Sequence, residues 1–385
     1  MRILVPIALL LLAPAQNARS QGEARVVLVA GGETAAVGIP ATQAKLTAPF
    51  GIARHPDASL RLVELAGGRY LKIDAQGVLS QLGGNGAKGY AGDGGPVRDA
   101  VFNSPHSLAI ASSGDVYIAD TLNYCVRRVD GRTGVITTLA GTGVNGYSGD
   151  DGPASRAQCS GVYCVALSPD DRRLYLADLE NRRVRVVDLA TGMITTIAGN
   201  GERGVPADGA LAKDSPLVDP RAVAVDSQGN VYILERGGHA LRVVDASGRI
   251  RTVAGTGARG YGGDGGPALQ AEMRGPKHLC LDGEENVIIA DTDNHVIRKY
   301  LPREGRIVAV AGAGRQGAAG VPGPAGEVEL NFPHGVFLDA DGSLLIVDSM
   351  NNRVLRVTFR VNAPNAREVL REGDTVSVFE PLAGG

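Results

Sequence analysis

A segment of about 57 residues recurs six times along this chain, and this recurrence constrains the fold more than any single residue does. Its clearest marker is a short strand led by proline, Pro105–Ile110. The corresponding segments of the other units begin at Pro49, Val162, Pro220, Pro276 and Pro333. A repeat of this length with several short strands is typical of a propeller or an array. We therefore predict an all-β fold, a six-bladed β-propeller of four-stranded blades.

In unit 2 the turn signals place strands at about 106–111, 115–120, 125–130 and 134–140. Unit 6 has only three strands, which end near Phe359. An additional strand, Val26–Ala30, precedes unit 1, so we expect it to complete blade 6. The predicted organisation is residues 1–21 as signal peptide and short leader, 22–361 as propeller and 362–385 as a C-terminal tail. Within the tail, Thr375–Phe379 could add one edge strand.

The amino terminus is typical of an export signal, with an apolar run from Ile3 to Leu12 followed by Ala13-Pro14-Ala15. The run is too short to span a membrane. We expect a secreted or periplasmic monomer. The net charge is −2 with both signs interspersed, which argues against nucleic acid as a partner. The chain has no Trp, so the blades must pack mainly on aliphatic side chains.

Four cysteines are present. Cys280 falls inside a predicted strand and is interpreted as a small buried hydrophobe. Cys125, Cys159 and Cys164 lie near the boundary between units 2 and 3. Export makes disulfides possible, so one bridge between blades 2 and 3 is a hypothesis whose pairing the sequence does not determine.

A carboxylate occupies the same place in every unit, between the second and third predicted strands. Asn stands three residues later in four units, and Arg seven residues later in four. We interpret this set as structural, with each carboxylate accepting turn amides and pairing with the Arg, rather than as a ring of metal ligands. The six residues are Glu64, Asp120, Asp178, Glu235, Asp291 and Asp348.

Glycine-rich inserts connect the units, and three of them follow the pattern Gly-Tyr-x-Gly-Asp. They are found at residues 89–96, 146–153 and 260–267. The Tyr and Asp at fixed spacing raise the possibility of calcium binding. Each copy has only one or two carboxylates, fewer than a Ca²⁺ shell usually uses, which favours a structural role.

Two segments, Tyr117–Asn123 and Ile289–Lys299, resemble the NHL repeat, and the resemblance extends over residues 25 to about 360. It implies a six-bladed β-propeller. The inserts are similar to those of exported bacterial NHL proteins and of the teneurin NHL region. Most members of the family are binding platforms for proteins, glycans or RNA, and a minority, including peptidyl-hydroxyglycine lyase, are enzymes.

The first strand of each propeller blade lines the central channel, so the residue after each marker proline should lie at the channel mouth. One of the six is apolar, Phe50, and the others are polar or cationic. These others are our candidate ligand-binding residues: His106, Tyr163, Arg221, Lys277 and His334. Their variety and charge indicate a binding site for a small molecule or a peptide terminus, with an anionic ligand as the hypothesis, and a solvated channel mouth without a ligand is the alternative.

The resemblance to the lyase implies zinc held by histidines of Pro-His motifs in alternate blades. His106 and His334 match two of these positions, whereas the third is Arg221, which cannot ligate a metal. We therefore expect no metal or other cofactor. The predicted function is recognition of a protein or a small anionic ligand at the insert-bearing face and channel mouth. A lyase or hydrolase that uses the channel residues is the alternative.

Overall fold

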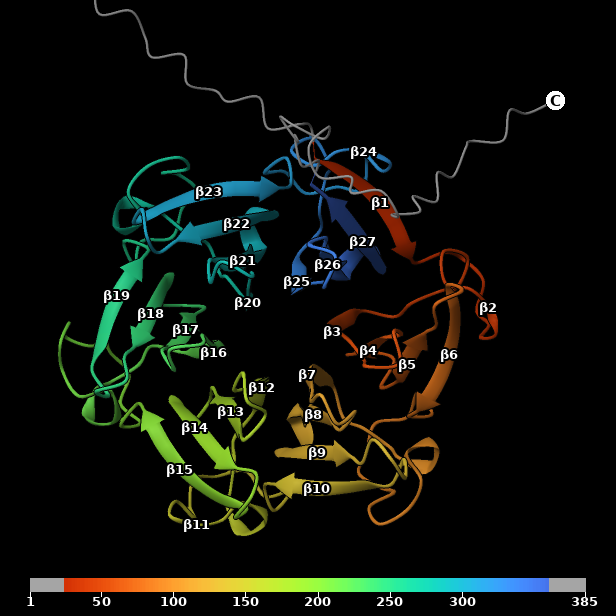
Figure 1. The fold of residues 1–385 in the computed structure, drawn as a ribbon, viewed down its shortest axis with the longest axis horizontal. Coiled ribbons are helices and arrows are strands. Elements are labelled where there is room, and N and C mark those ends of the chain that lie inside the picture. The colour runs from red at the N-terminus through yellow and green to blue at the C-terminus, as the bar shows by residue number, and fades with distance from the viewer. Residues whose placement is uncertain (1–23, 360–385) are drawn as a thin grey trace, which may run out of the picture.

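The computed structural model describes residues 24–359, and the expected signal peptide and C-terminal tail lie outside them. Six antiparallel sheets surround a central axis like the blades of a propeller (Figure 1). The predicted all-β, six-bladed fold is confirmed. In each blade the first strand of the repeat lies nearest the axis, and the second and third strands follow outward in sequence order. The fourth strand continues this order in five blades, whereas in blade 6 it is the N-terminal strand β1.

The strands of the first three blades, from the axis outward, are as follows. Blade 1 has β3 (Pro49–Arg54), β4 (Leu60–Glu64), β5 (Tyr70–Ile73) and β6 (Val78–Gly83); blade 2 has β7 (Pro105–Ile110), β8 (Val116–Asp120), β9 (Cys125–Val129) and β10 (Ile136–Ala140); blade 3 has β12 (Val162–Leu167), β13 (Arg173–Asp178), β14 (Arg183–Asp188) and β15 (Met193–Ala198).

The remaining blades follow the same order. Blade 4 has β16 (Pro220–Val225), β17 (Val231–Glu235), β18 (Ala240–Val244) and β19 (Ile250–Ala254); blade 5 has β20 (His278–Leu281), β21 (Val287–Asp291), β22 (Val296–Leu301) and β23 (Arg306–Ala311); blade 6 has β25 (Pro333–Leu338), β26 (Leu344–Asp348), β27 (Arg353–Thr358) and β1 (Arg25–Ala30). The last strand of unit 2 starts later than predicted because Gly134, with φ of 69°, belongs to the turn.

Strand β1 closes the ring. It pairs antiparallel with β27, from Arg25 opposite Thr358 to Ala30 opposite Val354. The predicted completion of blade 6 by an N-terminal strand is confirmed. Val26 of this strand is fully buried, whereas Val27 is 44% exposed. The closure therefore joins the beginning and the end of the described chain in one sheet.

The inserts cover the outer edges of the blades. Three of them contribute short strands that pair with an outermost strand: β2 (Ile39–Pro40) with β6, β11 (Gly152–Pro153) with β15 and β24 (Gly323–Pro324) with β1. In the other three blades a single bridge occupies the same place, as between Pro96 and Val135. Since an exposed edge strand presents unpaired backbone groups, these inserts protect every blade from edge-to-edge association.

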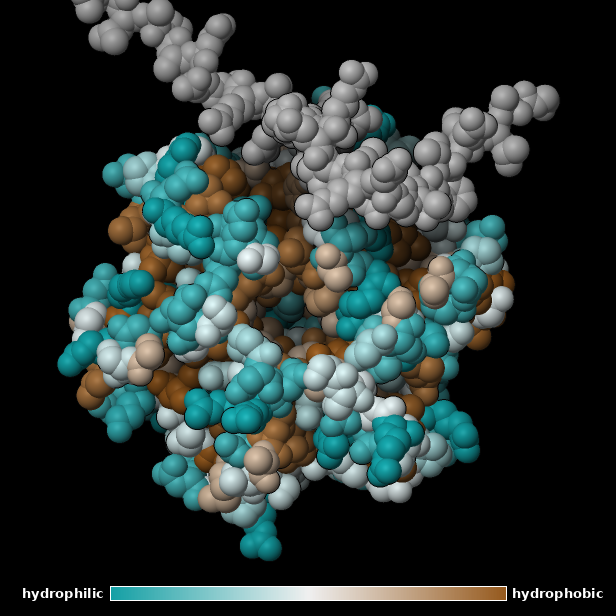
Figure 2. Space-filling model, in the orientation of Figure 1, coloured by the Kyte–Doolittle hydropathy of each residue, from teal (hydrophilic) through white to brown (hydrophobic). Residues whose placement is uncertain are grey.

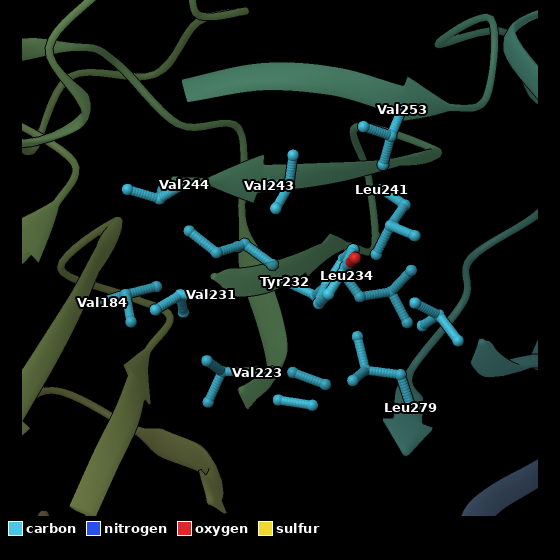
Figure 3. Close-up of a cluster of buried hydrophobic side chains, with 14 of the residues drawn as sticks. Val184, Val223, Val231, Tyr232, Leu234, Leu241, Val243, Val244, Val253 and Leu279 are labelled. Carbon is cyan, nitrogen blue, oxygen red and sulfur yellow. The ribbon is translucent and has the colours of Figure 1, made fainter. Parts of the chain in front are cut away.

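Aliphatic side chains fill the spaces between blades. Figure 3 shows this core at blade 4, where Val223 and Val231 lie between Val184 of blade 3 and Leu279 of blade 5. Corresponding clusters occupy the other blade interfaces. The expectation that the blades pack mainly on aliphatic side chains agrees with these clusters.

The repeated carboxylate is fully buried in all six blades. In five blades it accepts a hydrogen bond from the backbone N–H of the residue 17 positions earlier, as Asp120 does from Asn103 at 2.7 Å, and in blade 3 the donor stands 18 positions earlier. The other five donors are Thr47, Ser160, Val218, Arg274 and Asn331. The donor lies at the end of the insert and not in the carboxylate's own turn, as the sequence had suggested. The contact therefore ties the turn to the start of the inner strand.

An arginine neutralises each carboxylate, but its position varies. Arg127 lies 3.4 Å from Asp120 and donates at closer range, 2.8 Å from Nε, to Asp93 of the preceding insert. In blades 1 and 6 the arginine stands five residues after the carboxylate instead of seven, as Arg353 does at 2.7 Å from Asp348. The predicted pairing is present, with the insert aspartate as an additional partner that the sequence did not indicate.

The turn after the carboxylate contains a left-handed residue in every blade, and only blade 1 uses glycine there. The other five are Tyr124, Arg182, His239, His295 and Asn352, with φ between 48° and 57°. This conformation is unfavourable for residues with a Cβ atom. The buried carboxylate network therefore holds a strained turn in place.

Blades 1 and 4 carry Glu instead of Asp, and each has Gly where four other blades have Asn. A Cβ atom on Gly238 would lie 2.7 Å from Oε2 of Glu235. The longer side chain thus occupies the space that the Asn amide fills elsewhere, as Asn123 does beside Asp120 at 2.8 Å. Glu with Gly and Asp with Asn are two solutions to the same packing problem.

Deletion of Arg25–Ala30 is expected to lower the melting temperature of the whole domain, because it opens blade 6 and exposes the edge of β27. The loss should be several kcal/mol out of a total of about 5–15. Thermal denaturation followed by circular dichroism measures the effect. Val27→Ser, on the exposed side of the same strand, is the control and should have little effect. An unchanged melting temperature after the deletion would contradict the closure.

Gly238→Asn alone is expected to destabilise the protein by about 1–3 kcal/mol, because the new side chain clashes with Glu235. Combining it with Glu235→Asp recreates the Asp, Asn and Arg set of blade 2 and should recover most of the loss. Urea denaturation of the two single variants and the double variant gives the interaction free energy, expected at about 0.5–3 kcal/mol. Simple additivity would show that the two positions do not share one space.

Candidate functional site

The six residues after the marker positions form a nearly continuous ring where the inner strands begin. Phe50 stacks on His334 with 4.1 Å between ring centroids and meets His106 edge-on at 5.1 Å. The ring of Tyr163 lies 4.5 Å from that of His106 and also 4.5 Å from the guanidinium of Arg221. Five residues from blades 1, 2, 3, 4 and 6 are therefore brought together although they are far apart in sequence.

Lys277, from blade 5, makes different contacts from the other five residues of the ring. Its Nζ donates to Asp293 at 2.8 Å and lies 5.5 Å from the centre of the Phe332 ring. Burial lowers the pKa of Lys277, while Asp293 acts in the opposite direction. Of the two cations among the candidate mouth residues, Lys277 therefore has a counter-ion within its own blade.

Arg221 has no carboxylate within ion-pair distance among residues 24–359. Its side chain is buried, and its one recorded hydrogen bond runs from Nη1 to the carbonyl oxygen of Tyr163 at 3.3 Å. Burial lowers its pKa to about 10, although the charge of Asp219 partly opposes this lowering. The other five buried arginines all pair with a carboxylate: Arg61, Arg127, Arg185, Arg242 and Arg298. A buried guanidinium that lacks a counter-ion is costly, so the channel mouth carries unbalanced positive charge.

The two ring histidines share one hydrogen-bond pattern. Nδ1 of His106 lies 2.8 Å from the carbonyl oxygen of Ser104, and Nδ1 of His334 lies 2.7 Å from that of Phe332. Because a carbonyl only accepts, each Nδ1 carries the proton. Burial, and then the charges of neighbouring basic residues, hold both pKa values well below the ordinary 6.5. Both rings are therefore neutral, and each Nε2 is left as an acceptor.

His278 belongs to the same region, and the sequence reasoning missed it. It lies one residue beyond the mouth position of blade 5, and β20 begins with it. Burial, followed by the charge of Arg221, lowers its pKa to about 4. Its Nδ1 accepts from the backbone N–H of Val336 at 3.4 Å, which places the proton on Nε2. The sequence signal that could have identified His278 is its size and polarity, because the other units have Gly, Ser, Cys or Ala at the same position of the repeat.

The inserts lie away from this ring. In the first one, the hydroxyl of Tyr90 donates to Asp93 at 2.6 Å, and the same carboxylate accepts from the backbone N–H of Thr138 on the outermost strand β10. The carboxylates that suggested calcium are thus bound to protein donors. Within residues 24–359 no group of three or more His, Cys, Asp or Glu side chains is arranged to hold a metal ion.

The disulfide hypothesis is not realised, because all four cysteines are free thiols. Cys125, Cys159 and Cys164 are buried, and Cys159 and Cys164 pack as small apolar groups in the clusters between blades.

Comparisons with known proteins agree with this architecture. The family model of the NHL repeat matches residues 102–128. The chain is 25% identical over 289 residues to Protein SUPPRESSOR OF QUENCHING 1, chloroplastic, of Arabidopsis thaliana, covering 72% of this chain and 27% of that protein. It is 24% identical to NHL repeat-containing protein 2 of Gallus gallus, covering 68% and 40%, and 28% identical to Teneurin-1 of Mus musculus, covering 54% and 8%. The chain therefore spans less than half of the length of these relatives.

Among solved structures, an auxiliary nutrient binding protein from Bacteroides thetaiotaomicron superposes with a TM-score of 0.63 at 16% identity, covering 88% of this chain and 77% of that one. This similarity concerns the fold. The structure and the ring of repeats define a six-bladed β-propeller. The matches to the NHL repeat and to NHL-containing relatives support an NHL-repeat β-propeller family for this chain. Residues 24–359 contain no helix long and apolar enough to cross a membrane.

The free energy of unfolding is expected to fall below pH 6.5 in part because of His334. Its folded-state pKa is lowered, so below pH 6.5 the unfolded chain binds a proton at this histidine that the folded chain does not bind. The free energy of unfolding therefore falls as the pH falls. The variant His334→Phe lacks this titrating group and therefore this part of the pH dependence. Between pH 7.5 and pH 5, urea denaturation should show the parent losing about 1–2 kcal/mol more than the variant. An equal loss in both would mean that this histidine titrates normally in the folded protein.

Proposed function

We propose that this protein is an exported recognition scaffold that binds a small anionic ligand at the mouth of its central channel. The observation that carries the proposal is Arg221, a buried guanidinium without a carboxylate partner in the described part of the chain. An anionic group beside it would supply the missing counter-ion and gain charge-assisted hydrogen bonds in a site shielded from water.

The neighbouring side chains suit the same ligand. The free Nε2 acceptors of His106 and His334 would take hydrogen bonds from hydroxyl or amine groups, and the rings of Phe50 and Tyr163 provide apolar and aromatic contact. Ligand sites commonly combine apolar walls with a few placed polar groups. The nutrient-binding role named for the Bacteroides structure is consistent with a binding function and with export.

A lyase or hydrolase at the same place is the second candidate. The observation in its favour is the pair of neutral histidines, His106 and His334, each with a free Nε2 near the charge of Arg221. Such groups can accept a proton while a cation stabilises developing negative charge. Zinc or iron at one equivalent in the purified protein would favour this enzyme, although two histidines alone fall short of the usual three-ligand zinc site.

Arg221→Met is expected to have two opposite effects. Binding of acetate, phosphate or sulfate, measured by isothermal titration calorimetry, should weaken by about 1.5–3 kcal/mol for any anion that binds the parent. The melting temperature without ligand should rise, because an uncompensated buried charge is replaced by an apolar side chain of similar length. Arg251→Met, on the exposed outer strand β19, is the matched control and should change neither. If none of the three anions binds the parent, or if binding survives in Arg221→Met, the proposal is wrong.

A further inference from the structure

Beyond the mouth, the central channel contains a cavity of about 330 Å³. The inner strands of all six blades line it, and Figure 2 shows the molecule hollowed at its centre with hydrophobic residues around the hollow. Most of the lining side chains are apolar. They include Ala109, Ile110, Ala166, Leu167, Ala224 and Leu281.

This apolar surface differs from the cores between blades. Core side chains such as Ile118 and Ile233 are fully enclosed, whereas Ile110, Leu167 and Leu281 remain partly exposed to the channel. No segment among the described residues covers them. Apolar surface enclosed on all sides by six strands favours a ligand with an apolar part over bulk water.

The cavity is polar at the end that adjoins Arg221. Cys164 and His278 belong to its lining, and Nη1 of Arg221 donates to the carbonyl of Tyr163, the residue directly before Cys164. The backbone N–H of Val336 occupies Nδ1 of His278, so Nε2–H is a donor. One end of the channel therefore offers a cation and a neutral donor, and most of its wall is aliphatic. Arg54 also belongs to the lining, but it is paired with Asp339.

We propose that the channel binds an amphipathic monoanion, a carboxylate with an unbranched alkyl chain, with its head group at Arg221 and His278 and its chain along the aliphatic wall. This inference rests on the proposed role of Arg221 in binding an anion. The cavity has the volume of about eleven water molecules at liquid density. It therefore has room for a carboxylate and about eight carbon atoms, and longer chains would extend out of the channel.

The test is a series of straight-chain carboxylates, acetate, butanoate, hexanoate, octanoate and dodecanoate, each titrated into the folded protein by calorimetry below its micelle concentration. The dissociation constant is expected to fall about two- to fourfold for each added methylene up to octanoate and then to level off. If acetate binds as tightly as octanoate, the channel inference is wrong and the anion site at Arg221 stands. If no member of the series binds, and phosphate and sulfate also fail, the proposed function itself fails.

Variants that fill the channel test where the alkyl chain of the ligand binds. Ala166→Phe should remove the advantage of octanoate over acetate while acetate still binds, because it fills the cavity away from Arg221. Ala109→Phe, from a different blade, is the second variant if the first does not fold, and circular dichroism checks both. Val205→Phe, on an exposed insert with 66% of the side chain accessible, is the control and should bind like the parent. If octanoate binds both channel variants as it binds the parent, the alkyl chain does not occupy the channel and the inference is overturned.

Discussion

In every blade a fully buried carboxylate accepts the backbone N–H of a residue 17 or, in blade 3, 18 positions earlier, and the rest of the structure depends on this contact. It joins the turn between the second and third strands to the end of the preceding insert. The donor stands three residues before the mouth position, as Asn103 does before His106. The same hydrogen bond that holds a left-handed turn therefore also sets where each channel residue starts, because the inner strand continues directly from it.

The charge balance of this contact is kept even where its residues change. Glu235 with Gly238 replaces the Asp and Asn of blade 2, and Arg353 reaches its carboxylate from a different position than Arg127 does. A buried carboxylate without a partner would be expensive, so each change of position is accompanied by a compensating one. Against this background Arg221 departs from the rule, since it is buried and unpaired within the described chain. Uncompensated charge that a fold tolerates is a common property of binding sites.

The channel mouth combines three kinds of group that do not neutralise one another. Arg221 is a cation, His106 and His334 are neutral acceptors because burial lowers their pKa, and Phe50 with Tyr163 supplies aromatic surface. Lys277 lies in the same ring but is satisfied by Asp293. The arrangement supports the proposed recognition of an anionic molecule by preformed groups, since the contacts of each side chain to its neighbours already hold it in position.

The sequence by itself determined the six blades, their strands, the closing role of Arg25–Ala30 and the identity of the mouth residues. These follow from a repeat period, a local alternation of side chains and a count of strands, all readable along the chain. The pairing of each repeated carboxylate with an arginine was also predicted from the sequence, but only the tertiary structure decided how the other charges are paired. Arg127 meets Asp93 from 34 residues away, Lys277 meets Asp293, and Arg221 meets no carboxylate in the described chain. His278 and the channel cavity also appeared only there. Such features depend on distances between side chains that folding brings together, which the one-dimensional pattern does not encode.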